Sequence, residues 1–499
     1  MKSPLKRMTS AFSPVIAVNR KASKPLHRQI YDGFRGLIVE HNLSAGQQIP
    51  STRALATELK ISRIPVLTAY AQLLAEGYFE SRAGAGTFVC SSLPDQLPSA
   101  DRRAAPTKKV RSGVRPIAAR ALLLPRFERF PWLRGGGAFS LSQPAFDQFP
   151  FAEWSRLVMR HSRNPHTNTL RYGGPWGSEH LRDSICTYLR TSRAVHCQPK
   201  QVMIVTGSQQ ALEISARVLL DPGSSVWVEE PGYWLARHVL IGAGARMVPV
   251  RVDSEGIDVS AGIKLCRKAR AAFVAPSHQY PLGATMSASR RMQLLDWAQS
   301  AGSWVIEDDY DSEYRYGSMP IASLQGLDQH SRVIYIGTFS KTLFPALRLG
   351  YVVIPEDLVD RFVAVRHAMD VAPPSFFQAV LTDFMNEGHF ARHIRRMRLL
   401  YGERRTALVE ALRKEFGSTL EILGAEAGMH LAVILPKNIR DTEIANRAAR
   451  QNLWLWPLSS SYLGKNPRQG FVLGFGSTTA EEMPRAVHRL KEVLAFATP

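Results

Sequence analysis

Lys341 lies in a segment whose side chains suit the binding of an aldehyde that carries a phosphate. Thr338 and Ser340 precede the lysine, and Arg348 follows it seven residues later. A lysine amine can form a Schiff base with an aldehyde, while the two hydroxyls and the guanidinium can hold a phosphate dianion. The spacing of these four residues therefore predicts covalent binding of a phosphorylated aldehyde.

An acidic run upstream of this segment supplies the second part of the chemistry. The apolar residues 304–306 lead into Glu307, Asp308 and Asp309, as in a buried strand that ends at an acid. An acid in that place can keep a pyridine nitrogen protonated, so that the ring acts as an electron sink. We expect Asp308 to have this role, with Asp309 as the alternative because the acidic run permits a shift of one residue. Together with the lysine, the acid predicts a pyridoxal 5'-phosphate site.

A second contact for the phosphate is expected at Ser208 and Gln209. These residues follow Gly207, directly after the apolar stretch 202–206, and they begin a helical pattern. Backbone N–H groups at the start of a helix attract an anion. Many helices begin after a glycine without any ligand, so this turn supports the site only in combination with Lys341.

The chain has 499 residues and a formal net charge of +21, which is unevenly distributed. A chain of this length is too long for one hydrophobic core and predicts two or three domains. Residues 1–130 hold 21 Lys and Arg against 8 Asp and Glu, as a nucleic-acid-binding end would. A solvated basic face explains the charge alone equally well.

The four cysteines, Cys90, Cys186, Cys197 and Cys266, are scattered without CxxC spacing. They predict neither a disulfide framework nor a zinc site, so no metal is expected, and they fit a reducing cytoplasm. The sequence has no signal-peptide core and no apolar stretch of membrane-spanning length. We therefore expect a cytoplasmic protein without a membrane partner.

The first ninety residues have the pattern of three helices and a hairpin. Helical patterns cover residues 25–43, 52–59 and 63–76, and short strands at 78–80 and 87–89 flank a glycine-rich turn. This order predicts a winged helix-turn-helix, in which the start of the third helix reaches the base edges of double-stranded DNA. Taken one at a time, the candidate residues are more simply surface arginines and a capping serine. The residues expected at the DNA are Arg53, Ser62, Arg63 and Arg82.

From residue 139 onwards, helical patterns alternate with short apolar strands, which predicts a mostly parallel sheet with helices on both faces. A smaller α+β lobe is expected after about residue 370. The fold class is thus α/β, with a winged helix-turn-helix at 20–90, a Pro- and Arg-rich linker at 91–134 and a cofactor domain at 135–499. The expected strands are 202–206, 225–229, 272–275, 304–307, 333–336 and 350–354.

The N-terminal residues resemble the winged helix-turn-helix of the GntR superfamily. The resemblance covers nearly the whole of this domain. Ile64-Pro65 departs from the family, which usually has polar residues there, and this leaves the operator sequence open. The matching segments include Pro25-Leu26, Ile49-Pro50-Ser51-Thr52-Arg53, Ser62-Arg63 and Gly84-Ala85-Gly86-Thr87-Phe88-Val89.

The rest of the chain resembles fold-type I aminotransferases, and the two parts together resemble MocR-type regulators over residues 20–499. The resemblance implies that Lys341 forms the Schiff base with pyridoxal 5'-phosphate, that Tyr310 contacts the ring hydroxyl and that Tyr233 stacks on the pyridine ring. It also implies that Tyr172 reaches the phosphate bound by a neighbouring subunit. A homodimer with shared sites and head-to-tail pairing follows from that implication.

Two positions depart from the aminotransferase pattern. Tyr280 stands where these enzymes have an asparagine bonded to the ring hydroxyl, although His278 offers a nearby replacement. Val472 stands where the resemblance places the arginine that binds a substrate carboxylate. Arg468 and Arg237 are candidate substitutes without a motif behind them. Without a bidentate guanidinium an amino acid is oriented less firmly, so half-transamination is possible but efficient turnover is not expected.

These features predict a pyridoxal phosphate-dependent, DNA-binding transcriptional regulator of metabolic genes. An amine or amino acid would be sensed by exchange with the aldimine at Lys341, or pyridoxal phosphate itself would be the effector. The alternative is an active aminotransferase with an accessory DNA-binding domain. A third reading is a dimeric DNA-binding protein whose cofactor domain is only structural.

Overall fold

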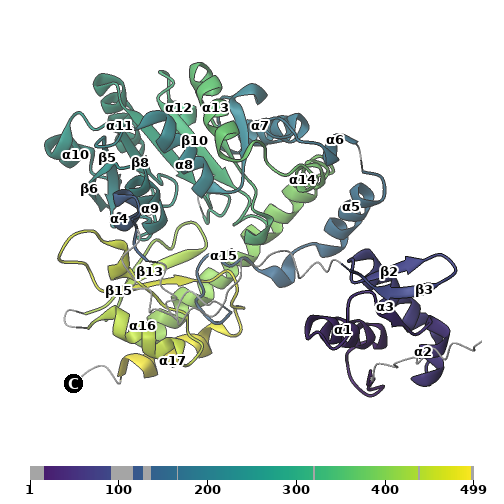
Figure 1. Cartoon of the computed structure of the whole chain (residues 1–499). Helices are drawn as coiled ribbons and strands as arrows, with labels where there is room; N and C mark the ends of the chain where they lie inside the picture. Colours follow the sequence, from purple (N-terminus) through teal and green to yellow (C-terminus); the bar gives the residue numbers. More distant parts are fainter. Residues whose placement is uncertain are drawn as a thin grey trace, which may run out of the picture. The chain divides into compact units, whose positions relative to one another are not determined.

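The computed structural model describes residues 16–91, 116–126, 136–165, 167–317, 321–436 and 439–495. The chain divides into two compact units, Met1–Pro116 and Ile117–Pro499 (Figure 1). Most of the predicted linker lies outside the described residues. Within its described part, the short helix α4 (Ala119–Leu123) packs against α9 (Trp234–Gly242) of the large unit. In the described ranges, no helix is long and apolar enough to cross a membrane.

The small unit has three helices and a three-stranded sheet with strand order β1-β3-β2. Its core packs the rings of Phe34, Tyr70 and Phe79 edge to face, with centroids 5.2–5.5 Å apart. Ser51 caps α2, because its hydroxyl accepts a hydrogen bond from the backbone N–H of Ala54 at 3.2 Å. The elements are α1 (Leu26–Val39), β1 (Gln48–Ile49), α2 (Thr52–Glu58), α3 (Arg63–Ala75), β2 (Phe79–Arg82) and β3 (Gly86–Val89).

Two details of the small unit differ from the sequence-based expectation. The first helix was expected to continue to residue 43, but it ends at Val39 because His41 adopts a left-handed backbone conformation with φ +60°. The strand β1 was not predicted, since two residues are too short for a period of two to be recognised. It pairs with β3, with Gln48 opposite Phe88, and joins the wing to the helices.

The large unit is built on an eight-stranded sheet with strand order β4-β11-β10-β9-β8-β5-β6-β7. Neighbours from β10 through β9, β8 and β5 to β6 are parallel, whereas β11 runs antiparallel to both β10 and β4. The prediction of a mostly parallel α/β sheet is therefore confirmed. The strands are β4 (Val202–Val205), β5 (Ser225–Glu230), β6 (Arg246–Asp253), β7 (Gly256–Ile257), β8 (Ala271–Val274), β9 (Trp304–Asp309), β10 (Val333–Thr338) and β11 (Gly350–Val353).

Helices cover both faces of this sheet, as Figure 1 shows. Successive strand residues point to opposite faces, so Ile204 packs into one buried apolar cluster while Met203 packs into another. Both faces are buried, which is why the strands are apolar without alternation. The helices are α5 (Phe151–Arg163), α6 (Thr167–Leu170), α7 (Glu179–Arg193), α8 (Ser208–Leu219), α10 (Val259–Cys266), α11 (Ala288–Ala301), α12 (Leu324–Leu327), α13 (Val359–Asp370) and α14 (Phe376–Asn386).

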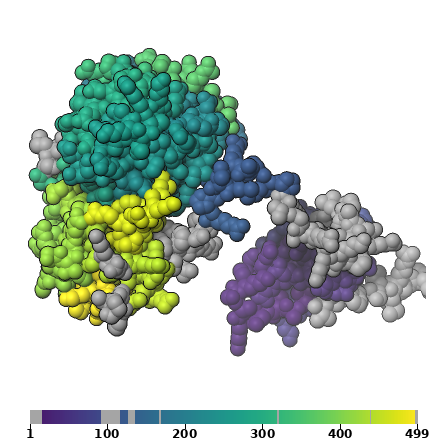
Figure 2. Space-filling model, turned by 90° about the vertical axis from the view of Figure 1, so that its left-hand side faces the viewer, coloured from purple at the N-terminus to yellow at the C-terminus, as the bar shows by residue number. Residues whose placement is uncertain are grey.

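A C-terminal lobe follows the long helix α15 (His389–Phe416). It has a four-stranded antiparallel sheet with strand order β12-β13-β15-β14, and its apolar cluster packs this sheet on α15 and α17. Figure 2 shows this lobe, in yellow-green, adjoining the teal part of the chain that contains the large sheet. The elements are β12 (Glu421–Leu423), β13 (His430–Ile434), α16 (Asp441–Ala449), β14 (Trp456–Pro457), β15 (Gly470–Gly474) and α17 (Met483–Ala495).

Candidate functional site

A cavity of about 330 Å³ lies between the large sheet and the C-terminal lobe. The strands β4, β9 and β10 run in the same direction, and their carboxyl ends meet at this edge of the sheet. Ligands of open α/β sheets bind at such an edge. The predicted residues that line the cavity are Lys341, Asp308, Tyr310, Tyr233, Ser208, Thr338, Ser340 and Arg348.

Lys341 stands in the loop after β10, between the buried side chains of Phe339 and Leu343 that fix the loop on the core. Burial lowers the pKa of Lys341 to about 8, although the carboxylates of Asp311 and Asp308 oppose this shift. A lowered pKa leaves more of the amine neutral, and the neutral amine is the nucleophile. The lysine is thus both positioned and activated for attack on an aldehyde.

Asp308 and Asp309 lie on opposite faces of β9, so only one of them reaches the cavity. Asp309 is paired with Arg193, whose Nε lies 2.8 Å from Oδ2, and the same oxygen accepts a hydrogen bond from Tyr335 at 2.5 Å. The Oδ1 atom of Asp308 is buried and has no hydrogen-bond partner among the described residues. Burial, with Asp309 nearby, raises the pKa of Asp308 to about 7. Of the two alternatives, Asp308 is the acid that lines the cavity.

The groups suited to a phosphate come from three chain segments. Arg348 has a left-handed backbone with φ +50°, and its guanidinium covers Gly207 at the turn before α8. Ser208 is the first residue of α8, so its backbone N–H lies at the positive end of the helix. The hydroxyls of Thr338 and Ser340 are 3.1 Å apart. Together these segments supply a guanidinium, two hydroxyls and a helix N-terminus.

Two predicted residues do not line the cavity. The side chain of Gln209 donates from Nε2 to the carbonyl oxygen of Leu235 at 2.9 Å, which ties α8 to α9. Only the backbone of Gln209 therefore faces the helix start. Tyr172 is 92% exposed in the segment between α6 and α7, so in a single chain it contributes nothing to the cavity.

The aromatic residues near the cavity are held by polar and edge contacts. The hydroxyl of Tyr310 donates to the carbonyl oxygen of His278 at 2.9 Å and lies 3.2 Å from its Nδ1. The ring of Tyr233 packs edge to face against that of Tyr280, with centroids 5.7 Å apart. Burial raises the pKa of Tyr310 well above its ordinary value, which keeps the hydroxyl protonated.

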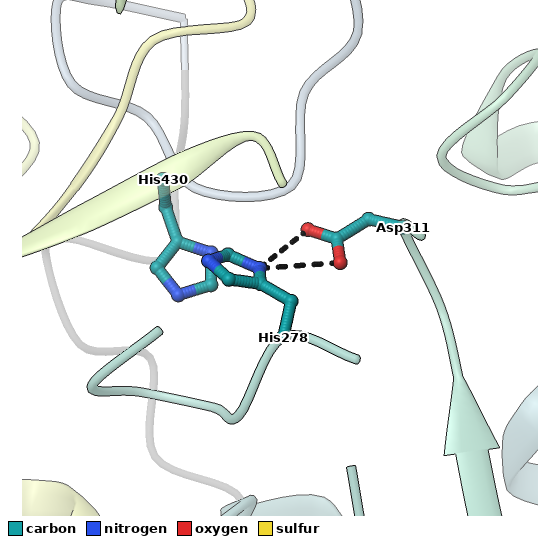
Figure 3. Close-up of side chains that lie close together, drawn as sticks. All are labelled: His278, Asp311 and His430. Carbon is teal, nitrogen blue, oxygen red and sulfur yellow. Dashed lines mark hydrogen bonds and ion pairs between the residues drawn. The ribbon is translucent and has the colours of Figure 1, made fainter. Parts of the chain in front are cut away.

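A buried cluster of His278, Asp311 and His430 borders the cavity (Figure 3). Nδ1 of His278 lies 3.0 Å from Oδ2 of Asp311, and the two imidazole centroids are 4.6 Å apart. Burial lowers the pKa of His430 well below its ordinary value, and the adjacent His278 adds to the shift. The three side chains offer donor atoms within 4.8 Å of one another, a spacing that a metal ion can bridge. The sequence analysis missed His430, because only the fold brings β13 to the edge of the large sheet.

Further residues of the cavity wall also escaped the sequence analysis. Glu229 lies at the end of β5, accepts a hydrogen bond from Gln279 at 3.2 Å, and has its pKa raised to about 8 by burial. The rings of Trp234 and Trp456 stack with centroids 5.7 Å apart. Glu229 could have been found from the sequence, because it lies in the same short motif as Tyr233. No sequence pattern pointed to the two tryptophans, because they come from separate elements, α9 and β14.

The arginines considered as substitutes for a carboxylate-binding residue are engaged elsewhere. Arg237 is buried and pairs with Glu230 at 3.5 Å, and Arg468 pairs with Glu421 at 2.5 Å. Neither lines the cavity. Val472 is fully buried on β15, in an apolar cluster with Leu282 and Leu458.

In the small unit, the residues expected at DNA are all exposed. Ser62 precedes α3 without a capping hydrogen bond, and the adjacent Arg63 donates from Nε to the hydroxyl of Thr52 at 3.1 Å. Arg53 lies in the first turn of α2. Arg82 ends β2 at the wing, where it pairs with Glu80 at 2.5 Å and lies over the ring of Phe88 at 4.5 Å. Helix starts and wing thus carry accessible guanidinium groups.

Comparison with known proteins agrees with the description of both units of the chain. Residues 139–490 match the family of aminotransferases of class I and II, and residues 26–89 match the gntR family of bacterial regulatory proteins. A kynurenine aminotransferase from Pyrococcus horikoshii, solved in complex with PMP, superposes with a TM-score of 0.71 at 27% identity. The superposition covers 77% of this chain and 98% of that chain. The fold and the site thus define a GntR-type helix-turn-helix joined to a fold-type I aminotransferase-like domain.

Relatives with the same two parts are transcriptional regulators. The chain is 38% identical to the probable rhizopine catabolism regulatory protein MocR of Rhizobium meliloti, over 96% of this chain and 95% of that protein. It is 29% identical to the pyridoxine biosynthesis transcriptional regulator PdxR of Corynebacterium glutamicum, over 93% of this chain and 94% of that protein. The chain belongs to the MocR-type helix-turn-helix transcriptional regulators. Its part in the cell is therefore DNA-binding regulation of transcription.

Proposed function

We propose that this regulator binds pyridoxal 5'-phosphate in the cavity through Lys341, and that the state of the cavity sets the affinity of the winged helix for its operator. Pyridoxal phosphate, when bound, supplies an aldehyde that condenses with amines and a ring that withdraws electrons. Lys341 holds the aldehyde end, and Asp308 holds the ring nitrogen. Arg348, Thr338, Ser340 and the start of α8 hold the phosphate. Such a regulator acts in the cytoplasm, where its operator lies.

The observation that carries this proposal is that Asp308 lines the cavity while its buried Oδ1 atom has no hydrogen-bond partner among the described residues. A buried polar atom without a partner costs about 1–3 kcal/mol, and buried polar groups are normally paired. Asp309 beside it is bound through Oδ2 to Arg193 and Tyr335, and it does not line the cavity. A protonated pyridine nitrogen would supply the donor that Oδ1 of Asp308 lacks, and Lys341 lines the same cavity as this acid.

The exposure of Tyr172 supports a dimer with shared sites. This side chain is 92% exposed and lies outside the cavity of its own chain. In a head-to-tail dimer it would reach the phosphate bound by the second subunit. The effector would be an amine, an amino acid or pyridoxal phosphate itself, and it would act by preferring one of two dimer states.

The test is chemical trapping. The full-length protein is incubated with pyridoxal phosphate, treated with borohydride and digested, and the modified peptide is identified by mass spectrometry. Modification at Lys341, and none in Lys341→Ala, is the expected result. Modification spread over exposed lysines such as Lys200 would overturn the proposal. Steady amino transfer from an amino acid to a keto acid would instead favour the aminotransferase reading.

A further inference from the structure

The cavity extends beyond the groups assigned to the cofactor, and this outer part is lined by Trp234, Trp456, Tyr280 and His430. Among the described residues, Lys341 and Arg348 are the lysine and arginine side chains that line the cavity. Arg348 covers Gly207 at the phosphate end. The outer part is therefore walled mainly by rings, without a lysine or arginine among its described residues.

A ligand carboxylate would find no matching charge there among the described residues of the same chain. The apolar cluster of Val472 with Leu282 and Leu458 forms the wall behind Tyr280 and Trp456. Burial lowers the pKa of His430, so its ring is neutral near pH 7. Removing a carboxylate from water without a cationic partner is strongly unfavourable.

An acidic residue adds to this selection. Asp311 lines the cavity and is buried. A like charge near an ionised carboxylate disfavours its binding. The outer part thus disfavours anionic ligands, because its described residues include no lysine or arginine and Asp311 lies nearby.

Trp456, a residue of the outer wall, carries an unpaired donor. The Nε1–H of Trp456 is buried and has no hydrogen-bond partner among the described residues. The hydroxyl-bearing residues Ser140 and Ser142 line the same cavity. A neutral oxygen on a ligand would satisfy the indole donor, and the stacked rings of Trp234 and Trp456 would cover an apolar or aromatic face.

From these contacts we propose that the ligand bound beside Lys341 is a primary amine that carries no carboxylate and offers a neutral oxygen. Amino alcohols and hydroxylated aromatic amines have this chemistry, whereas α-amino acids do not. This assignment rests on the proposed function, since the amine is recognised next to the cofactor.

The test uses matched ligands that differ by one carboxylate. Full-length protein loaded with pyridoxal phosphate is titrated with tyramine against tyrosine and with ethanolamine against serine. Two readouts are followed, the visible absorbance of the bound cofactor and the affinity for a DNA duplex selected by the protein from a random pool. At least one amine is expected to act at a concentration about tenfold below that of its amino acid, a difference typical of one lost charge-assisted contact.

Two tryptophan variants sharpen this test. Trp456→Phe keeps an aromatic ring but removes the indole N–H donor. It is expected to weaken the response to the better amine by roughly fivefold. Trp454→Phe is the matched control, because its Nε1–H is also unpaired but Trp454 does not line the cavity. Equal or stronger action of the amino acids, equal effects of the two variants, or no response to any amine would overturn the inference. Failure to take up pyridoxal phosphate at all would overturn the proposed function instead.

Discussion

The guanidinium of Arg348 lies directly over Gly207, so that a Cβ at position 207 would stand 2.9 Å from Nη2. Gly207 also has φ +110°, a conformation that favours glycine. The two residues are far apart in sequence, but β11 brings them together by pairing with β4, where Gly350 is opposite Val205. Strand pairing in the large sheet thus builds the phosphate end of the cavity.

Gly207→Ala should therefore displace Arg348 and weaken pyridoxal phosphate binding. A lost charge-assisted contact costs about 1.5–3 kcal/mol, which is roughly a 10- to 100-fold rise in Kd. The measurement is a fluorescence titration of the cofactor-free protein. Gly223→Ala is the matched control, because Gly223 has φ +90° but open space around its Cβ position. Equal loss of affinity in both variants would mean that backbone strain, not Arg348, is responsible.

The lowered pKa of Lys341 predicts the pH dependence of cofactor capture. Only the neutral amine attacks an aldehyde, so the capture rate of the cofactor-free protein should rise with pH and level off above about 8. Stopped-flow absorbance measures this rate. Lys341→Arg should give no capture at any pH, and a rate that stays constant through pH 8 would contradict the assignment.

Asp308→Asn should change the stability of the protein and its cofactor binding in opposite directions. The pKa of Asp308 is raised by burial to about 7, so the folded state binds more protons than the unfolded state. Stability contributed by this group therefore falls as pH rises from the ordinary aspartate pKa towards 7. Above pH 7 the variant should be more stable than the parent by on the order of 1–2 kcal/mol, yet bind pyridoxal phosphate more weakly. Urea unfolding and cofactor titration test the two effects.

Asp309→Asn is the contrasting variant. Asp309 forms a buried ion pair with Arg193, with both side chains at most 5% exposed. Removing one partner of a buried pair costs about 3–5 kcal/mol, so this variant should be less stable than the parent by roughly that amount. A stabilised Asp309→Asn or a destabilised Asp308→Asn would contradict their assignment to opposite faces of β9.

Ile64 should contact DNA through an apolar surface. It is 73% exposed in the first turn of α3, and Leu67, one turn further, is 44% exposed. Apolar side chains at this point of a recognition helix can pack against thymine methyl groups. Ile64→Ala should raise the Kd for the selected duplex roughly fourfold or more, the effect of about one buried methylene. Replacing thymine by uracil at the contacted step should weaken DNA binding by the parent and have little further effect on DNA binding by Ile64→Ala.

Mixed dimers test the shared site. If Tyr172 serves the neighbouring subunit, Tyr172→Ala and Lys341→Ala homodimers should both bind the cofactor poorly. A heterodimer of the two variants would contain one site with both residues intact, so mixing should restore up to half of the parental binding. Titration of purified, differently tagged heterodimers measures this. No recovery on mixing would contradict a site shared between subunits.

The sequence was sufficient for the parts of the site that lie within one motif. Thr338 ends β10, Ser340, Lys341 and Arg348 follow it, and Asp308 is the next-to-last residue of β9. Strand order alone therefore brings them to one edge. The choice between Asp308 and Asp309 could not be made without knowing which face of β9 each side chain points to. In the structure, the pairing of Asp309 with Arg193 shows that Asp309 points away from the cavity.

The outer wall could not be predicted because it comes from segments with no local signature. His430 and Trp456 belong to β13 and β14 of the C-terminal lobe, and only the packing of that lobe brings them near Lys341. Local patterns likewise missed β1, which forms because β3 offers it an edge. Long-range packing, not local propensity, decides these positions.

In the proposed function the cavity at Lys341 controls DNA binding, and a single binding experiment tests this control. The Kd of the full-length protein for its selected duplex is measured with and without pyridoxal phosphate, in the parent and in Lys341→Ala. We predict that pyridoxal phosphate, alone or with an amine that shifts its absorbance, changes the Kd of the parent severalfold and leaves that of Lys341→Ala unchanged. The same Kd under all conditions, with the cofactor bound, would contradict the claim.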